Sequence, residues 1–251
     1  MRPDALNPLF APAQSLTGIG PRLNLLLKKC LALPPGVSEP RVIDVLWHLP
    51  AGVIDRRAEP TVRDAVPGSI VTLCVRVLKH KAPPRGNVKA PYKVTCEDDT
   101  AKLDLVFFHA ERKFIERQLP EGELRYISGR IERYGDKLQM AHPDYIVPPD
   151  ARDDLPMLEP VYPLTAGLSG KVLTKAARQA LERVPEVEEW QDPQWLASRG
   201  WPPFVAALTR LHRPHDTQDV SNGAAPWQRL AYDELLAGQL ALGLVRQNVR
   251  T

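Results

Sequence analysis

Residues 71–77, with the sequence VTLCVRV, decide the fold of this chain. Every second position from Val71 to Val77 is apolar, and the positions between carry Thr72, Cys74 and Arg76. An alternation with a period of two is typical of a β-strand that buries one face. The stretch therefore predicts a strand in an antiparallel or barrel-like sheet.

The same strand pattern returns in four later segments, at residues 94–96, 102–108, 126–131 and 137–140. Residues 111–119 read as a helix between the third and fourth of the five strands. Three strands, a helix and two strands is the element order of an OB-fold, a five-stranded, partly open β-barrel. We therefore expect an OB-fold in the middle of the chain.

Helical patterns flank the predicted barrel on both sides. Before it they cover residues 21–29 and 42–49, and after it residues 169–184, 204–211 and 227–249. The predicted fold class is α+β, with an N-terminal helix-hairpin-helix-like unit (1–62), an OB barrel (63–150) and a C-terminal helical segment (151–251). The last pattern meets no Gly or Pro stop, so we expect a truncated chain.

Composition excludes several classes of protein. With 43% hydrophobic and 25% charged residues the chain is not disordered, and 26 Pro residues predict many short elements. Three Cys without a Cys-x-x-Cys spacing indicate neither a disulfide framework nor a zinc site. No signal peptide or 18-residue apolar run is present, so we expect no membrane contact and a cytoplasmic protein. No catalytic or metal site is predicted.

The strongest charge signal lies between the first two predicted strands. This stretch contains no carboxylate and five cations, namely Lys79, Lys81, Arg85, Lys89 and Lys93. The corresponding loop of an OB-fold usually lines its nucleic-acid site. A bound anion would also relieve the electrostatic repulsion among the like charges of the loop. The sequence thus predicts phosphate binding here; a solvated, flexible loop is the alternative.

Aromatic residues near these cations are candidates for stacking on bases. Strand alternation sends Leu103, Leu105 and Phe107 inward and leaves Phe108 on the opposite face. Tyr92 closes the basic loop, and Arg130 shares an outer face with Tyr126 as a further phosphate ligand. For each aromatic ring, packing in the core or at the rim is the alternative.

A glycine turn precedes the first helix, in the sequence LTGIGP at residues 16–21. Gly18 and Gly20 flank one apolar residue, so backbone N–H groups converge where the helix dipole favours a phosphate. This is the pattern of a helix-hairpin-helix turn. A tight turn between packed helices is the alternative.

Taken in order, seven groups of motifs resemble the N-terminal region of the RecG branch-migrating DNA helicases. They are LTGIG (16–20), HLP with IDRR (48–50, 54–57), FFH (107–109), QMAHPDY (139–145), PVYPLTAGLS (160–169), LHRP (211–214), and DELLA with QLAL (233–237, 239–242). Phe108 matches the second aromatic position of that family. The family's loop aromatic is missing; either Tyr92 or the Pro83-Pro84 pair replaces it, or the loop acts by charge alone.

This resemblance implies a wedge at the branch point of a replication fork or four-way junction. It implies a monomer whose helicase motor lies in the same polypeptide and binds ATP and Mg²⁺, so that this piece has no cofactor and is inactive alone. The rival hypothesis is a stand-alone OB module that binds single-stranded nucleic acid or docks a protein. A reading frame that continues past Thr251 into a Gly-x-x-x-x-Gly-Lys-Thr loop would favour the helicase.

Overall fold

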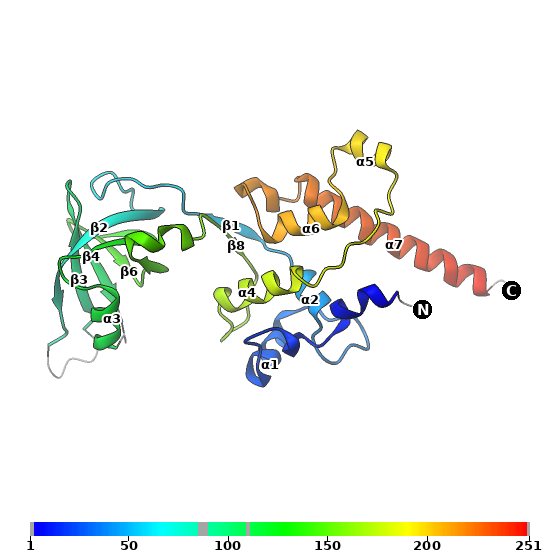
Figure 1. Cartoon of the computed structure of the whole chain (residues 1–251), viewed down its shortest axis with the longest axis horizontal. Coiled ribbons are helices and arrows are strands. Elements are labelled where there is room, and N and C mark those ends of the chain that lie inside the picture. Colours follow the sequence, from blue (N-terminus) through cyan, green and yellow to red (C-terminus); the bar gives the residue numbers. More distant parts are fainter. Residues whose placement is uncertain (1–2, 85–89, 109–110, 250–251) are drawn as a thin grey trace. The chain divides into compact units, whose positions relative to one another are not determined.

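The computed structural model describes residues 3–84, 90–108 and 111–249. Its contacts divide the chain into two compact units. The barrel unit is Ile54–Met157, and the helical unit combines Met1–Val53 with Leu158–Thr251. Figure 1 shows the elements of each unit, coloured along the sequence.

The barrel unit is built from β2 (Ile70–Lys81), β3 (Tyr92–Glu97), β4 (Lys102–Phe107), β5 (Leu124–Tyr134) and β6 (Lys137–Ala141). Their order in the sheet is β2-β3-β4-β6-β5, and β5 pairs again with β2, which closes the barrel. β4 and β6 run parallel, whereas the other neighbouring pairs are antiparallel. This arrangement confirms the predicted OB-fold. A short strand, β7 (Tyr145–Val147), extends the sheet beyond β5.

Inward-pointing side chains fill the barrel as the alternation predicts. Leu103, Leu105 and Phe107 are buried in its core together with Val75 of β2. The helix α3 (Arg112–Gln118) adds Ile115 to the same core. Each such side chain contributes roughly 1.5–3 kcal/mol when fully removed from water, so the core is the main stabilising element of this unit.

The helical unit contains α1 (Pro21–Cys30), α2 (Val42–Leu46), α4 (Gly170–Leu181), α5 (Pro193–Arg199), α6 (Phe204–His212) and α7 (Ala225–Val249). Short 3-10 helices precede α1 (Asp4–Phe10 and Ala13–Ser15) and α7 (Thr217–Val220), and another lies in the barrel unit (Pro149–Asp154). Pro21 opens α1, and Ser169 caps α4 by accepting a hydrogen bond from the Val172 N–H. β1 (Gly52–Asp55) and β8 (Leu158–Val161) pair in a two-stranded sheet at the points where the chain passes between the units.

The two ends of the chain share one hydrophobic core. Leu16 and Leu27 from the N-terminal part are buried in a cluster with Leu173, Leu208 and Leu230 from the C-terminal part. This grouping differs from the three segments expected at 1–62, 63–150 and 151–251. The physical reason is that each short amphipathic helix has one apolar stripe, and these stripes bury one another.

The barrel unit also begins earlier and ends later than the expected segment. Arg56 lies before the first barrel strand, yet its side chain is buried against the barrel. Residues after β6 add β7 and a 3-10 helix to the same unit. Packing of these flanking segments on the sheet therefore moves the division to Ile54–Met157.

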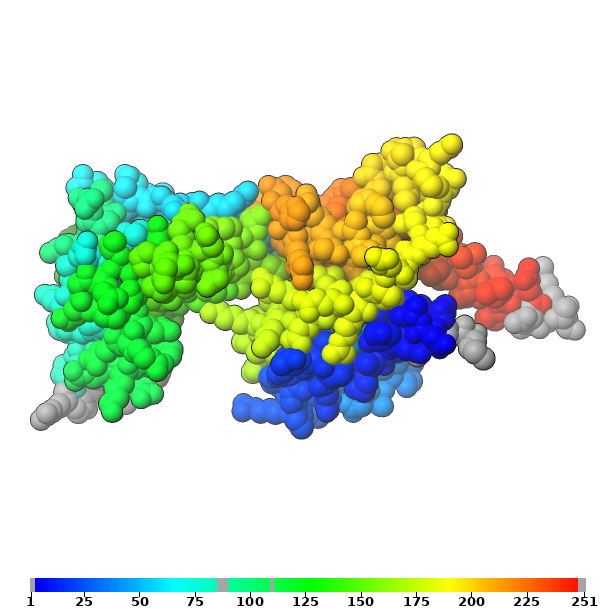
Figure 2. All heavy atoms as spheres, in the orientation of Figure 1, coloured from blue at the N-terminus to red at the C-terminus, as the bar shows by residue number. Residues whose placement is uncertain are grey.

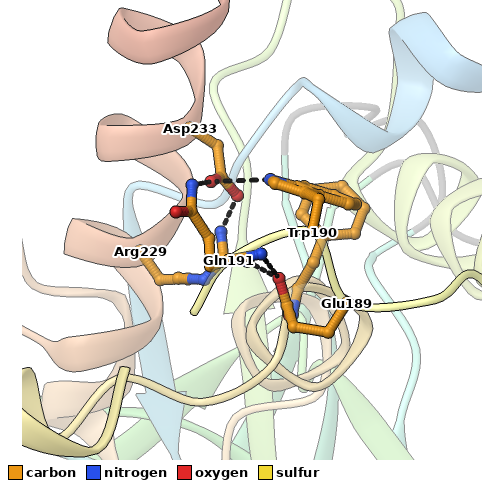
Figure 3. A network of polar contacts seen from close by, with 6 residues as sticks. Glu189, Trp190, Gln191, Arg229 and Asp233 are labelled. Atoms are coloured by element: carbon orange, nitrogen blue, oxygen red, sulfur yellow. Dashed lines mark hydrogen bonds and ion pairs between the residues drawn. The ribbon is translucent and has the colours of Figure 1, made fainter. Parts of the chain in front are cut away.

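A partly buried polar network attaches α7 to the loop that precedes α5 (Figure 3). Arg229 of α7 is 0% exposed; it donates to Oε1 of Glu189 at 2.6 Å and forms an ion pair with Asp233. The Trp190 indole N–H donates to Asp233 at 3.2 Å, and the Gln191 amide does so at 3.0 Å. The guanidinium lies 5.4 Å from the centre of the Trp190 ring. The network therefore holds the first half of α7 in place.

Candidate nucleic-acid interface

The outer surface of the barrel is covered where β2 pairs with β5. There the Arg56 guanidinium donates to Ser128 Oγ at 3.2 Å and to Asp144 Oδ2 at 3.0 Å. The Thr72 hydroxyl donates to the Arg56 carbonyl at 3.0 Å. The Arg56 guanidinium also lies 4.9 Å from the centre of the Tyr145 ring. Because these groups occupy that side of the sheet, it offers little room for a ligand.

The outer surface over β2 and β3 is basic. Three of the cations predicted to lie in the basic loop lie on strands instead. Lys79 and Lys81 belong to β2 and Lys93 to β3, because these strands extend into the stretch predicted to be a loop. Lys79 pairs with Thr95 and Lys81 with Lys93 across the two strands. Paired residues of an antiparallel sheet share a face. We call Lys79, Lys81 and Lys93 the basic face.

The lysines of the basic face lack direct ion-pair partners among the described residues; Asp104, on the same side of the sheet, bonds the Thr95 hydroxyl instead. No carboxylate of the described residues forms an ion pair with Lys79, Lys81 or Lys93. Like charges directly opposite each other on a sheet are destabilising, as at the Lys81 and Lys93 pair. A bound polyanion would relieve this repulsion. The other two predicted phosphate ligands, Arg85 and Lys89, lie outside the described residues.

Phe108 directly follows β4 and is 45% exposed. Val106, two residues earlier on the same face, pairs with Lys93, so Phe108 lies at the end of β4 next to the basic face. Its backbone N–H donates to His142 Nε2 at 3.0 Å, and the two rings lie 5.7 Å apart. An exposed ring held at its backbone is suited to stacking on a base.

Tyr92 is placed differently from the sequence-based prediction. Its side chain is only 5% exposed and belongs to the barrel core, because position 92 points inward opposite Phe107. Its hydroxyl lies 3.0 Å from His80 Nδ1, and burial raises the pKa of the phenol. A ring held in the core cannot stack on a base, so we remove Tyr92 from the stacking residues.

Arg130 is exposed on β5, opposite Ile70 of β2. Its guanidinium donates to the carbonyl of Gly68 at 2.6 Å. Part of its hydrogen-bonding capacity is therefore used to hold the turn before β2. A guanidinium has five N–H donors, so Arg130 can still donate to a phosphate. Phosphate binding by Arg130 stays a prediction.

Gly18 and Gly20 lie in the helical unit, immediately before α1. Gly18 has a φ of +94°, a conformation that favours glycine, and Gly20 is the N-cap of α1. The Gln179 side chain of α4 accepts from the Thr17 N–H at 2.7 Å and donates to the Thr17 carbonyl at 3.1 Å. A single 3-10 turn, Ala13–Ser15, precedes the glycine turn where a helix-hairpin-helix would have an α-helix. Phosphate binding by this turn remains a prediction.

His142 is a residue that the sequence did not single out for the site. Its backbone has a φ of +45°, which is uncommon for a residue other than glycine. Nε2 accepts the Phe108 N–H, so the neutral ring carries its proton on Nδ1. The interaction depends on the pairing of β4 with β6, which brings the turn after β6 to the end of β4. No local sequence signal reveals it.

Among residues 3–84, 90–108 and 111–249, no group of three or more His, Cys, Asp or Glu side chains could hold a metal ion. Within the same ranges, no helix is both long and apolar enough to cross a bilayer.

Comparison with known sequences identifies the barrel. A profile described as an OB-fold nucleic acid binding domain matches residues 71–148. This range contains β3, β4, β5 and β6 completely and all of β2 except its first residue. The profile supports assignment of the barrel to the OB-folds that bind nucleic acids.

Longer matches extend over nearly the whole chain. The ATP-dependent DNA helicase RecG of Escherichia coli strain K12 is 32% identical over 247 residues, which cover 94% of this chain and 33% of that protein. RecG of Aquifex aeolicus is 24% identical over 91% of this chain and 30% of its own length. The chain therefore spans about a third of the length of these relatives.

A solved structure, described as RecG bound to a three-way DNA junction, has the same fold. It matches 96% of this chain and 32% of its own length, with a TM-score of 0.71 and 22% sequence identity. Sequence and fold agree over the same region. We conclude that this chain is homologous to the N-terminal, OB-fold-containing region of the RecG helicases.

Proposed function

We propose that this chain binds branched DNA, namely replication forks and four-way junctions, and splits strands as the wedge of a RecG-type helicase. The observation that carries the proposal is the basic face beside the exposed Phe108, on a barrel homologous to that of RecG; its three lysines form no ion pair within the described part of the chain. The lysines would contact phosphates, and Phe108 would stack on a base at the branch point. Such contacts read shape and charge, with little sequence preference.

Branch migration and fork reversal require a motor. We propose that ATP and Mg²⁺ are bound by a helicase motor in the same polypeptide, that the chain is monomeric and cytoplasmic, and that this region alone does not hydrolyse ATP. The relatives are named ATP-dependent helicases and are about three times as long as this chain. This supports a separate motor region beside the DNA-binding region.

The helical unit offers a surface for that motor. A groove of about 850 Å³ runs beside α7 and is lined by Trp47, Trp190, Phe204 and Trp227. Leu240, which also lines the groove, and Leu244 further along α7 are exposed, and Figure 2 shows this half of the helix (red) extending away from the rest of its unit. Exposed apolar patches of this kind usually mark an interaction site. We propose that they pack against the motor.

The experiment that tests DNA binding compares three substrates in band-shift assays: a fork, single-stranded DNA and linear duplex. Tightest binding to the fork is expected. Equal affinity for all three substrates would contradict the wedge. Tightest binding to single-stranded DNA would favour the rival hypothesis of a stand-alone OB module.

A further inference from the structure

The barrel unit contains a small pocket that the proposed DNA contacts do not use. It has a volume of about 220 Å³ and lies between α3 and the turn after β6. We propose that this pocket receives one unpaired nucleobase from the branched DNA bound by the basic face. The proposal rests on the function proposed above and adds a specific site for a flipped-out base.

The size of the pocket suits a single ring system. Sites for drug-sized ligands enclose roughly 300 to 1,000 Å³, so a pocket of about 220 Å³ is too small for a whole nucleotide. Sugar and phosphate would remain outside, where they meet the surface of α3. The pocket is thus matched to the base alone.

Aromatic rings form its walls. Phe107, Phe114 and His142 line the pocket, and the Phe107 and His142 rings meet edge to face with centres 6.1 Å apart. The hydrogen bond from the Phe108 N–H fixes the orientation of the His142 ring. Every base has a π-face, so rings of this kind accept bases of any identity. This tolerance suits a protein that recognises branched DNA by shape.

One polar group distinguishes a base from an aliphatic or phenyl side chain. Gln118 lines the pocket. Its backbone carbonyl accepts a hydrogen bond from Arg125, but its side-chain amide has no hydrogen-bond partner among the described residues. An amide provides both donors and an acceptor, which the edge of a base can satisfy. A hydrocarbon ligand would leave this half-buried amide unpaired, which is unfavourable.

The surroundings also suit a nucleotide backbone. Phe108 stands beside the pocket, with its ring 5.7 Å from that of His142. Lys113 and Arg117 are exposed on α3, and the Arg117 guanidinium lies 5.7 Å from the centre of the Phe114 ring. These two cations would meet the phosphates that flank an inserted base. An exposed aromatic ring and two exposed cations therefore lie next to residues that line the pocket.

A fluorescent base tests the proposal. A fork with 2-aminopurine as a single unpaired nucleotide at the branch point is titrated with the chain, and stacking in the pocket should lower its emission. The Phe114→Ala and Gln118→Leu variants should abolish this decrease. They should also weaken binding to this fork about tenfold, while leaving unchanged the affinity for a fork with an abasic site at the same position.

Leu124→Ala is the matched control, since Leu124 is exposed on β5 and does not line the pocket. Phe114 is 47% exposed, so its truncation should leave the circular dichroism spectrum unchanged. Unchanged 2-aminopurine emission, or equal losses on basic and abasic forks, would overturn the pocket proposal while fork binding itself persists. Failure of the unaltered chain to prefer a fork over linear duplex would refute the proposed function instead.

Discussion

The buried cation of the helical unit and the exposed cations of the barrel have opposite surroundings. Arg229 is fully buried between two carboxylates, Glu189 and Asp233. Lys81 and Lys93 oppose each other on the outer side of β2 and β3 without a carboxylate partner among the described residues. A buried charge must be paired, whereas an exposed charge can remain unpaired and available. The comparison separates cations that stabilise the fold from cations that can bind DNA.

The largest expected effect is at Arg229. Replacing it by Met leaves two carboxylates without their partner and should lower the free energy of unfolding of the helical unit by about 3–5 kcal/mol. All five Trp residues lie in the helical unit, so tryptophan fluorescence in a urea titration measures this unit. Arg22→Met, at an exposed position on α1, is the control and should change stability by less than about 0.5 kcal/mol. If Arg229→Met lowered the free energy of unfolding by less than about 1 kcal/mol, Arg229 would not be a cation that stabilises the fold.

His212 sharpens the comparison because it is buried without charge. Burial lowers its pKa to about 4, its Nε2 donates to the Leu46 carbonyl at 2.8 Å, and its Nδ1 accepts from the Tyr162 hydroxyl at 2.9 Å. Above pH 6.5 neither the folded nor the unfolded state protonates it. As the pH falls from 6.5 to 4, only the unfolded state takes up the proton, so stability should decrease by about 3 kcal/mol.

The measurement is the free energy of unfolding, from tryptophan fluorescence, at several pH values between 4 and 7. A His212→Gln variant has no group to titrate and should show a shallower slope than the original chain over this range. Identical slopes for the two proteins would mean that His212 is not the buried neutral group.

Arg56 is the more deeply buried of two buried arginines among the described barrel residues, Arg56 and Arg125, and it should behave like Arg229. Arg56→Met should destabilise the barrel unit by about 2 kcal/mol, less than at Arg229 because its partner Asp144 is partly exposed and can be solvated. Faster amide hydrogen exchange in β5, where Ser128 contacts Arg56, is the measurement. Unchanged exchange relative to the original chain would show that the covered side of the barrel does not need this residue.

Replacing lysines of the basic face should weaken DNA binding without lowering stability, the reverse of what is expected at Arg229 and Arg56. Lys81→Ala combined with Lys93→Ala should change stability by less than about 0.5 kcal/mol or increase it slightly, because a like-charge pair is removed. Fork affinity should fall, and the slope of log affinity against log salt should decrease by roughly 2. Lys102→Ala is a control, since Lys102 already has a partner in Glu97 at 3.9 Å. An unchanged salt slope would exclude the basic face from the interface.

Much of the architecture was predictable from local patterns. The alternation from Val71 to Val77 and its repeats specified the barrel strands, and the ordered motifs identified the resemblance to RecG, which the comparisons confirm. The helical patterns predicted from residues 21 and 169 agree with the starts of α1 at Pro21 and of α4 after its cap Ser169, because caps depend on neighbouring residues alone. The stacking role predicted for Tyr92 gives way to its alternative, core packing, because the end of the basic loop is a strand whose alternation sends position 92 into the core.

The sequence by itself determined the OB-fold, the family and the excess of positive charge between Lys79 and Lys93, since each is encoded in periodicity, motif order or residue type. The tertiary structure alone decided which cations remain unpaired, which aromatic ring stays exposed and which helices share a core. Those properties depend on contacts between distant residues, as between Arg56 and Asp144 or Phe108 and His142. Such contacts depend on strand register and chain closure, which no local pattern specifies.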